Sequence, residues 1–554
     1  MPRWITRQRR RNSLPPSPSS RRSRSCASAT ERSGSARHGK GRLRSAFFVS
    51  GIHLFRRRMP TMASPSHDLL IVGAGINGAG IARDAALRGL SVVVCDRGDI
   101  AGATSSASTK LIHGGIRYLE QAAFGLVRES LREREILGRI AAHLVRPQRF
   151  IVPHTGERPA WMLALGLSLY DLLAGRRSLP ASQRLPPDFP LLRELDLPVT
   201  GSHAYFDLWV DDARLTLTNL KDARAHGAEV LPRHALVAVS ADPTSGWRCE
   251  LSGRAGRREI HARCVVNVAG PWVGEVEQLR GVPSPPLRLV QGTHILLPRL
   301  HAGDDAWLLQ QPDRRVVFVI PWDAHSHLVG TTETELASPS ALGATAAELE
   351  YLLSAIQRAF GRRLHTDDIQ WAFSGMRPLI GGDGKDARTA SREYRLSLEA
   401  TDRRRAWLTV QGGKLTTYRR LAETAVDLLT GPLGRTARSS TAERCLPGSG
   451  PAGSAALADL KRKAGVIPKE WIDALWQRHG TLTAQLIVNH ASGAGGAGRD
   501  FGGGLFEAEA RWCAEHEWAT EADDVMWRRT RCGVRMTPAQ RAAFSLWWSA
   551  QPFV

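Results

Sequence analysis

The chain has 554 residues, of which 42% are hydrophobic and 23% charged, a composition typical of a globular protein with two or three domains. Its formal net charge of +22 at pH 7 would suit a nucleic-acid-binding protein, but the charge is concentrated in one segment. Residues 1–60 contain 16 Lys and Arg and a single acid, for +15, whereas the other 494 residues carry only +7. Nucleic-acid binding therefore stays open only as an alternative that depends on the tail, and no nucleic-acid partner is expected for the fold.

Residues 1–62 are expected to be a disordered basic extension, because Arg, Ser and Pro dominate them and no apolar periodicity is present. Three interpretations remain open: a transit peptide, an arm that binds nucleic acid nonspecifically, or a segment that precedes the natural start of translation. We favour the third, in which the segment is not translated, because Met59 or Met62 stands directly before the first predicted strand.

The seven cysteines form no C-x-x-C pair, so neither a metal site nor a disulfide framework is predicted, and a reducing compartment is expected. Cys95 and Cys264 fall in apolar runs and are expected to be buried thiols. The most apolar segment, residues 161–174, is shorter than the roughly 18 residues that cross a bilayer. We expect it to form a buried helix, with a helix lying in a membrane interface as the alternative.

Residues 69–96 contain, in order, an apolar strand, a glycine-rich turn, a helical pattern, a second apolar strand and an acid. In such a G-x-G-x-x-G turn, Gly73 permits the tight bend, Gly75 lets the backbone approach a pyrophosphate, and Gly78 lets the helix pack on the strand. The helix N-terminus offers N–H groups to an anion, and Asp96 can accept hydrogen bonds from a ribose. The pattern predicts a dinucleotide-binding βαβ unit, but on its own it does not distinguish NAD from FAD.

A loop rich in hydroxyl residues follows, in the sequence TSSASTKLIHGGIRYLE at residues 104–120. Small hydroxyl residues and paired glycines allow a flat or phosphorylated ligand to approach the backbone closely. Further motifs lie downstream, at residues 158–175, 207–215, 265–273, 292–299, 316–322, 330–335, 373–379, 391–396, 412–419 and 516–530. Together with the glycine motif, this set closely resembles the aerobic FAD-dependent glycerol-3-phosphate dehydrogenases, which belong to the D-amino-acid-oxidase-like flavoproteins. The resemblance extends from about residue 66 to the end of the chain.

The resemblance implies an α/β fold in which a Rossmann-like FAD-binding domain is interleaved with a β-rich α+β substrate domain, followed by a helical C-terminal domain. The expected cofactor-domain segments are about 63–150, 205–275 and 370–437. The expected substrate-domain segments are about 151–204 and 276–369. A Ser/Gly/Pro-rich linker from about residue 437 would then lead into the helices of the C-terminal domain, residues 438–554.

The activity implied by the resemblance is FAD-dependent oxidation of sn-glycerol 3-phosphate to dihydroxyacetone phosphate, with hydride transfer from carbon 2 to flavin N5. Electrons would pass to a membrane quinone, so the enzyme would be cytoplasmic and peripherally associated with the inner membrane. A homodimer is left open. The alternative within enzymes is a related flavoprotein that oxidises an amino acid or a 2-hydroxy acid, substrates whose carboxylates need no phosphate-binding set.

The motifs also imply individual roles. Residues expected to contact the cofactor are Gly73, Gly75, Gly78, Asp96, Thr104, Ser105, Ser106, Gly270, Gly412, Gly413, Lys414, Leu415 and Thr416. Residues expected to hold the substrate phosphate are Arg117, Tyr118, Arg377, Arg392 and Lys414, because a dianion needs several fixed cations. The general base is expected to be His294, with His113 as the alternative, and Arg377 or Lys414 would stabilise the developing alkoxide.

Overall fold

The computed structural model describes residues 66–553, except 176–177, 284–285, 382–392, 403–404, 436, 451–452, 464–466 and 492–495. The predicted N-terminal extension and Arg392 therefore lie outside the described residues.

The first sheet has eight strands, with β17-β18-β10-β1-β2-β7 in spatial order and a β8–β9 ribbon attached to β10. Strands β18, β10, β1, β2 and β7 run parallel. The strands are β1 (His67–Val72), β2 (Val92–Cys95), β7 (Glu229–Leu231), β8 (Ala235–Asp242), β9 (Gly246–Gly253), β10 (Gly256–Asn267), β17 (Tyr394–Asp402) and β18 (Arg405–Gly412). Four of the β1 residues have 0 to 6% exposure, as expected for a parallel strand that is covered on both faces.

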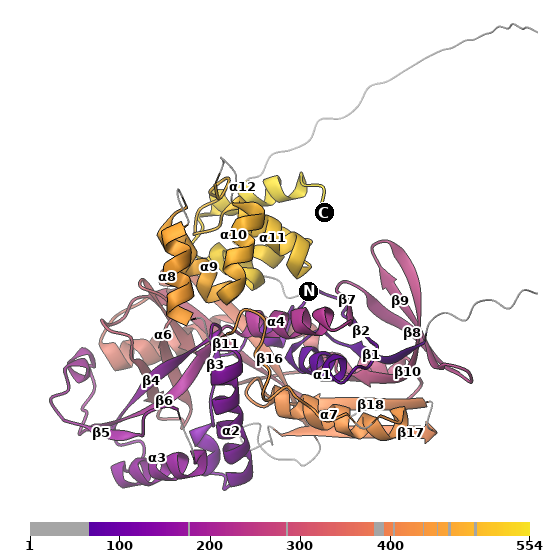
Figure 1. Ribbon diagram of the computed structural model, residues 1–554. Coiled ribbons are helices and arrows are strands. Elements are labelled where there is room, and N and C mark those ends of the chain that lie inside the picture. The colour runs from indigo at the N-terminus through magenta and orange to yellow at the C-terminus, as the bar shows by residue number, and fades with distance from the viewer. Residues whose placement is uncertain are drawn as a thin grey trace, which may run out of the picture. The chain divides into compact units, whose positions relative to one another are not determined.

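Three helices pack together on one face of this sheet: α1 (Ile76–Leu87), α4 (Asp212–Ala225) and α7 (Tyr418–Leu433). Figure 1 shows α1 and α7 beside the parallel strands. A β-carbon at Gly80 would come within 2.8 Å of the Tyr418 ring, so the glycine lets α1 and α7 approach closely. The β8–β9 ribbon covers the opposite face through a second apolar cluster, which includes Trp247 and Trp407.

The second sheet has ten strands, with β15-β11-β14-β13-β12-β4-β6-β3 in order, β16 paired with β11 and β5 paired with β6. Its strands are β3 (Leu111–Ile112), β4 (Val145–Pro153), β5 (Gln183–Leu185), β6 (Ser202–Val210), β11 (Leu287–Pro298), β12 (Ala306–Gln310), β13 (Val316–Pro321), β14 (Ser326–Gly330), β15 (Thr334–Leu336) and β16 (Trp371–Ile380). Helix α6 (Ala346–Phe360) packs in one of its apolar clusters, and α2 (Phe124–Ile140) and α3 (Ala160–Ala174) contribute to another.

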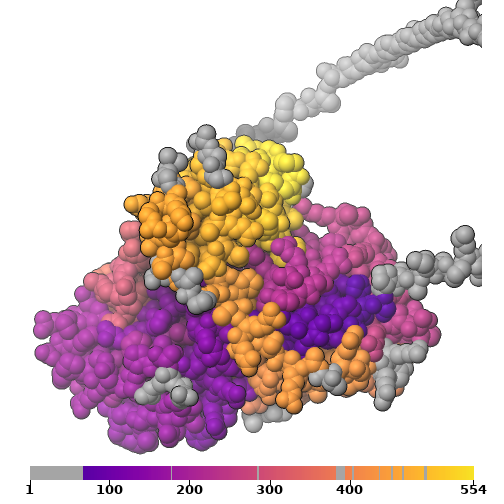
Figure 2. Space-filling model, in the orientation of Figure 1, coloured from indigo at the N-terminus to yellow at the C-terminus, as the bar shows by residue number. Residues whose placement is uncertain are grey.

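The C-terminal part of the chain is helical. It contains α8 (Gly453–Lys463), α9 (Lys469–His479), α10 (Thr483–His490), α11 (Glu507–Glu517) and α12 (Pro538–Ser549), while the short α5 (Val273–Gln278) belongs to the first sheet. These C-terminal helices gather into one group with apolar clusters of its own (Figure 1). Figure 2 shows their orange and yellow atoms lying against the magenta segment that contains α4. The predicted fold class, including the helical C-terminal part, is confirmed.

The domain boundaries remain a prediction. The second sheet includes β3, β4, β6 and β16, which lie largely within the ranges assigned above to the cofactor domain. The predicted helix at residue 79 begins three residues earlier, at Ile76. The sequence pattern after the apolar run 406–410 predicts a helix that opens at residues 411–414 and runs through Tyr418. The helix begins only at Tyr418, because Gly412 and Gly413 have φ of +73° and +94°, which an α-helix cannot accommodate.

Helix α3 is not buried as predicted. Trp161, Leu165 and Leu172 are 67%, 61% and 75% exposed, and only Leu167 and Tyr170 are buried. The segment is apolar on every side, so its sequence pattern does not indicate which side faces the core. Among the described residues, no helix is both long and apolar enough to cross a membrane.

The stretch after residue 437, expected to be a linker, packs against α1 where the structure describes it. The buried Arg83 guanidinium donates to the carbonyl oxygens of Thr441 and Arg444, at 3.4 and 2.7 Å. Leu446 is only 1% exposed. The Ser/Gly/Pro-rich composition therefore indicates an irregular backbone here and not a free linker. The buried Arg83 guanidinium fixes the conformation of this backbone.

Candidate active site

The glycine turn after β1 has the geometry that its sequence predicts. Gly73 has φ of +122°, and a β-carbon there would lie 2.6 Å from the Val268 carbonyl oxygen. A β-carbon at Gly78 would lie 1.9 Å from the Gly73 oxygen, so neither position tolerates a side chain without movement. Gly75 is the N-cap of α1 and provides no side chain to cap the helix. The start of α1 is therefore suited to an anionic group.

Two side-chain acceptors hold the glycine turn. Asp96, at the end of β2, accepts from the backbone N–H groups of Ala74 and Gly98 at 2.7 and 2.8 Å. Burial raises the pKa of Asp96 above its usual 3.8, although these hydrogen bonds oppose the shift. The second acceptor, Ser105 Oγ, accepts from the Ile76 N–H at 2.9 Å. Both predicted cofactor residues thus contact the turn itself.

The other hydroxyl residues of residues 104–110 fix the loop. Thr104 Oγ1 donates to the Met376 carbonyl at 2.7 Å, and Ser106 Oγ donates to Ala103 at 3.3 Å. A buried pair supports them: Lys110 Nζ lies 2.7 Å from an Asp212 carboxylate oxygen and donates to the Ser106 carbonyl. The sequence analysis missed Lys110 and Asp212, although both lie inside recognised motifs, because charged residues in a motif suggest a surface or a ligand before they suggest a buried pair.

The 412–416 turn lies beside the start of α1. Asn77 Nδ2 donates to the Gly412 carbonyl at 3.2 Å, and a β-carbon at Gly413 would lie 2.7 Å from the same nitrogen. Thr416 Oγ1 accepts from the His113 N–H at 3.2 Å. Leu415 joins an apolar cluster with Ile76, and Gly270 opens a short helical turn after β10 with φ of +58°.

This region leaves polar atoms for a ligand to satisfy. Asn77 Oδ1 and Gln411 Nε2 are buried without a hydrogen-bond partner in the part of the chain that the structure describes. Buried polar groups of this kind are normally paired. Together with the two glycine turns, they fit a dinucleotide that runs from the start of α1 toward residues 412–416.

Arg377 projects from the second sheet. It lies on β16 opposite Val290 of β11, and its Nη2 lies 3.4 Å from Thr331 Oγ1. A β-carbon at Gly292 would lie 2.6 Å from that nitrogen, so the glycine on β11 makes room for the guanidinium.

Arg117 contacts the same loop, and Lys414 contacts the residue next to Arg117. Arg117 Nη1 lies 3.4 Å from Glu333 Oε1, two residues beyond Thr331. Lys414 Nζ lies 3.9 Å from the ring centroid of Tyr118, the neighbour of Arg117. Three contacts between segments distant in sequence thus involve the three predicted cations, and we call the residues that make them the cation cluster: Arg117, Tyr118, Thr331, Glu333, Arg377 and Lys414.

A buried carboxylate fixes the loop at residues 330–335. Glu348 on α6 accepts from Thr332, Thr334 and Gln291 at 2.7, 2.8 and 2.6 Å. Although burial alone would raise its pKa, the hydrogen bonds from Thr332, Thr345 and Thr334 hold the pKa below its usual 4.5. The sequence identified the GTTETE motif but gave no sign of this acceptor.

His294 lies behind the cation cluster on β11. It is 1% exposed, its ring stacks on Phe373 at 5.0 Å, and its Nε2 lies 2.9 Å from Thr109 Oγ1. Burial, followed by the positive charges of Arg377 and Lys110, holds its pKa well below the usual 6.5. The imidazole is therefore neutral at pH 7 and can accept a proton. The alternative base, His113, is half-buried at the end of β3.

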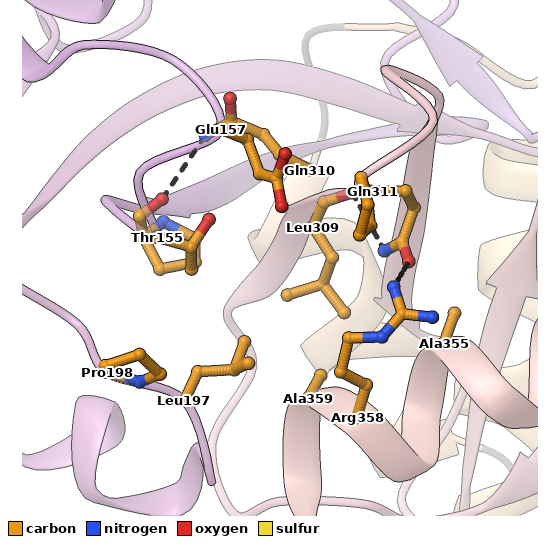
Figure 3. Close-up of a pocket in the computed structure, with 12 residues that line it drawn as sticks. Thr155, Glu157, Leu197, Pro198, Leu309, Gln310, Gln311, Ala355, Arg358 and Ala359 are labelled. Carbon is orange, nitrogen blue, oxygen red and sulfur yellow. Dashed lines mark hydrogen bonds between the residues drawn. The ribbon is translucent and has the colours of Figure 1, made fainter.

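Two features lie apart from this arrangement. A cavity of about 140 Å³ beside β12 and α6 is lined by Arg358 and Gln311, whose side chains hydrogen-bond at 2.8 Å (Figure 3), and none of the predicted site residues lines it. On α10 and α11, His490, Glu515 and His516 bring three potential metal-ligand atoms within 4.8 Å of one another.

Comparison with known proteins identifies the family. A model of FAD-dependent oxidoreductases matches residues 68–419. The chain belongs to this family. A model of the C-terminal domain of alpha-glycerophosphate oxidase matches residues 439–545 of the flavoenzyme. The predicted cofactor, FAD, and the predicted family resemblance are thereby confirmed.

Relatives of this flavoenzyme include dehydrogenases named for polyol phosphates. The aerobic glycerol-3-phosphate dehydrogenase of Escherichia coli is 40% identical, over 87% of this chain and 97% of the relative. The D-erythritol 1-phosphate dehydrogenase of Brucella abortus is 39% identical, over 88% and 99%. Among solved structures, a glycerol-3-phosphate dehydrogenase from Bacillus halodurans complexed with FAD has a TM-score of 0.65 at 24% identity, over 88% of this chain and 95% of that chain.

Proposed function

We propose that this flavoenzyme oxidises sn-glycerol 3-phosphate to dihydroxyacetone phosphate. The observation that carries the proposal is the cation cluster, in which Arg117 and Arg377 contact one short loop and Lys414 contacts Tyr118, the neighbour of Arg117. A phosphate dianion matches such a set of cations better than a single carboxylate does. The names of the relatives support the same substrate class.

Each part of the site has a role in this proposal. Bound FAD supplies the hydride acceptor. The cation cluster, together with Arg392, binds the phosphate and holds carbon 2 in place, and Arg377 or Lys414 stabilises the developing alkoxide. Neutral His294 takes the hydroxyl proton, and we assign Nδ1 as the acceptor, because Nε2 already contacts Thr109.

D-Erythritol 1-phosphate is the second candidate substrate, because the Brucella relative is as similar to this chain as the Escherichia one. A steady-state assay of the full-length holoenzyme with a quinone analogue separates the possibilities. We expect kcat/KM for glycerol 3-phosphate to exceed that for erythritol 1-phosphate, with no turnover of glycerol. A higher kcat/KM for erythritol 1-phosphate would make erythritol 1-phosphate the substrate in place of glycerol 3-phosphate. Turnover of only amino acids or 2-hydroxy acids would reject both candidates.

Electrons then pass to a membrane quinone in this proposal, with the flavoenzyme bound peripherally to the cytoplasmic face of the inner membrane. The exposed apolar face of α3 supports the membrane association, because the side chains of Trp161, Leu165 and Leu172 on this short helix are exposed to solvent. An apolar face with a tryptophan is typical of helices that lie in the membrane interface.

A further inference from the structure

A buried carboxylate in the cofactor loop is paired with cations from the far end of the chain. Asp99 lies in the segment between β2 and Thr104, and its two oxygens accept from Arg529 at 2.6 and 2.8 Å. Arg528 donates to the same carboxylate through Nε. The partners are 429 and 430 residues away in sequence. Asp99 and Arg529 have side-chain exposures of only 3% and 2%.

Burial makes each ion depend on the other. Although desolvation alone would raise the pKa of Asp99, the charges of Arg529 and Arg528 hold it well below its usual 3.8. Removing one partner of such a pair leaves an uncompensated buried charge, which is more damaging than the loss of an exposed pair. Arg233 Nη1 lies farther from the carboxylate, at 3.6 Å, so the two C-terminal arginines make the close contacts that hold the loop in this conformation.

The segment that contains Asp99 makes three hydrogen bonds with the glycine turn and the start of α1. Asp96 stands three residues before it and binds the Ala74 N–H, and the Ala101 N–H donates to the Ala74 carbonyl at 3.2 Å. Ser105, six residues after Asp99, binds the start of α1 through Ile76. Asp99 thus anchors the middle of a loop that contacts the cofactor turn both before and after it in sequence.

Arg529 is itself fixed within the C-terminal region. Its Nε and Nη2 donate to the Glu517 carbonyl at 3.0 and 2.9 Å. The Glu517 carboxylate in turn lies 2.6 Å from Arg214 of α4, with both side chains 2% exposed or less. The C-terminal region therefore contacts the cofactor domain through buried charges, and Figures 1 and 2 show this packing beside α4.

We propose that the C-terminal helical region is a cofactor-retention element, in which Arg529 and Arg528 are positioning residues that set the affinity for FAD by fixing the 97–103 loop through Asp99. Neither arginine needs to touch FAD. The adenosine end of the cofactor is bound by the glycine turn, and the turn takes its shape from the loop that the arginines fix.

The test compares FAD affinity with fold stability in the full-length protein. Arg529→Met removes the two-pronged donor but keeps an unbranched side chain. The matched control is Arg478→Met, because Arg478 makes an equally close two-pronged pair with Glu509, at 2.6 Å for both contacts, entirely within the C-terminal region. For each variant, the Kd for FAD is measured by reconstituting apoprotein, and the melting temperature is measured without FAD.

We expect Arg529→Met to raise the Kd for FAD at least tenfold, whereas Arg478→Met should change this Kd less than twofold. The two variants should lose a similar amount of melting temperature. Excess FAD should restore kcat of Arg529→Met, with KM for the substrate unchanged. Arg528→Met, which leaves Arg529 in place, should give a smaller increase in Kd and provides the measurement if Arg529→Met does not fold. An unchanged Kd in the arginine variant that folds, or an equal increase in Arg478→Met, would overturn the proposal.

Discussion

The protonation state of His294 is set by its surroundings. Its ring is buried beside two cations, Arg377 and Lys110, so the charged imidazolium is disfavoured and the pKa lies well below 6.5. A base of this kind stays competent at pH values where an exposed histidine would already be protonated. Arg377, which is proposed to bind the phosphate, therefore adds to the effect of burial in keeping the proposed base neutral.

The first prediction follows from that neutrality. If His294 is the base, kcat/KM should stay flat as the pH falls from 8 to 6.5, and the acid limb should appear only below 6.5. His294→Gln should lower kcat by roughly 100- to 10,000-fold, the usual contribution of a positioned base, with FAD content retained. His113→Gln is the matched variant. A larger loss of kcat in His113→Gln than in His294→Gln, or an apparent pKa near 6.5 that disappears with His113, would assign the base to the other histidine.

A second residue-scale prediction concerns the glycine turn. Gly78→Ala places a β-carbon 1.9 Å from the Gly73 oxygen, so the turn must move and α1 can no longer start where the cofactor needs it. We expect the purified protein to lose most of its FAD and about 1–3 kcal/mol of stability from overpacking. Gly125→Ala on α2, where a β-carbon meets nothing within 4 Å, is the control and should retain both. FAD absorbance per protein and urea unfolding provide the measurements.

At the scale of elements, helix α3 gives the clearest prediction about the membrane. Replacing Trp161, Leu165 and Leu172 with Ser removes its exposed apolar side chains, so co-sedimentation with anionic lipid vesicles should decrease. Each Leu buried in the interface contributes about 1.5–3 kcal/mol, so the combined partition coefficient should fall by at least roughly a hundredfold. Leu546→Ser is the control, because Leu546 is also 75% exposed but lies on α12. Equal binding of the triple variant and the parent would show that α3 is not the membrane contact.

The elements also show how far the sequence could be interpreted. The β1–α1–β2 unit was predictable because its apolar strands, glycine spacing and terminal Asp96 are all local signals. Helix α6 was predictable from its spacing of Leu and Ile. The exposure of α3 was not, because a segment that is apolar all round gives no direction of burial. The boundaries between the two interleaved domains stay a prediction for a similar reason, since strand pairing is decided between distant segments.

The candidate site, too, could be predicted from the sequence only in part. Arg117, Arg377, Lys414 and His294 could be named from their motifs, yet whether they carry the roles assigned to them remains a prediction. The contacts of Arg377 with Thr331 and of Arg117 with Glu333 depend on the register of β11 with β14 and β16, which no local pattern specifies. Glu348 could not be found from sequence, because a buried acceptor on a helix has the same local pattern as a surface glutamate.

At the scale of the whole molecule, buried neutral histidines make the stability of the fold depend on pH. His327 is 0% exposed, and its Nδ1 accepts from the Leu300 N–H at 3.0 Å. Burial, followed by the nearby His301 and Arg299, lowers its pKa to about 3. The unfolded chain takes up the proton near pH 6.5, and the folded protein does not take it up until near pH 3. Stability is therefore complete above pH 6.5 and decreases as the pH falls, by at most about 1.4 kcal/mol per pH unit for this group.

One buried carboxylate opposes this effect in the same range, because burial raises the pKa of Asp207 from its usual 3.8 to about 6, so its protonation stabilises the fold as the pH falls through 6. The pKa of Glu509 is lowered from its usual 4.5 to about 2. Burial alone would raise this pKa, but the interactions with Arg478 and His479 outweigh the effect of burial. A depressed carboxylate adds stability that is lost only as the pH falls below about 4.5, so carboxylates of this kind do not contribute between pH 6.5 and 5, and comparison of variants isolates the effect of His327 from that of Asp207. We expect the free energy of unfolding to decrease across this interval, and His327→Asn to reduce the slope, because the Asn oxygen can accept from Leu300 but does not titrate. His325→Asn, which removes an exposed histidine two residues away, should leave the slope as it is. Urea unfolding at pH 6.5, 5.75 and 5 measures all three proteins, and identical slopes for His327→Asn and the parent would contradict the assignment of His327 as a neutral buried group.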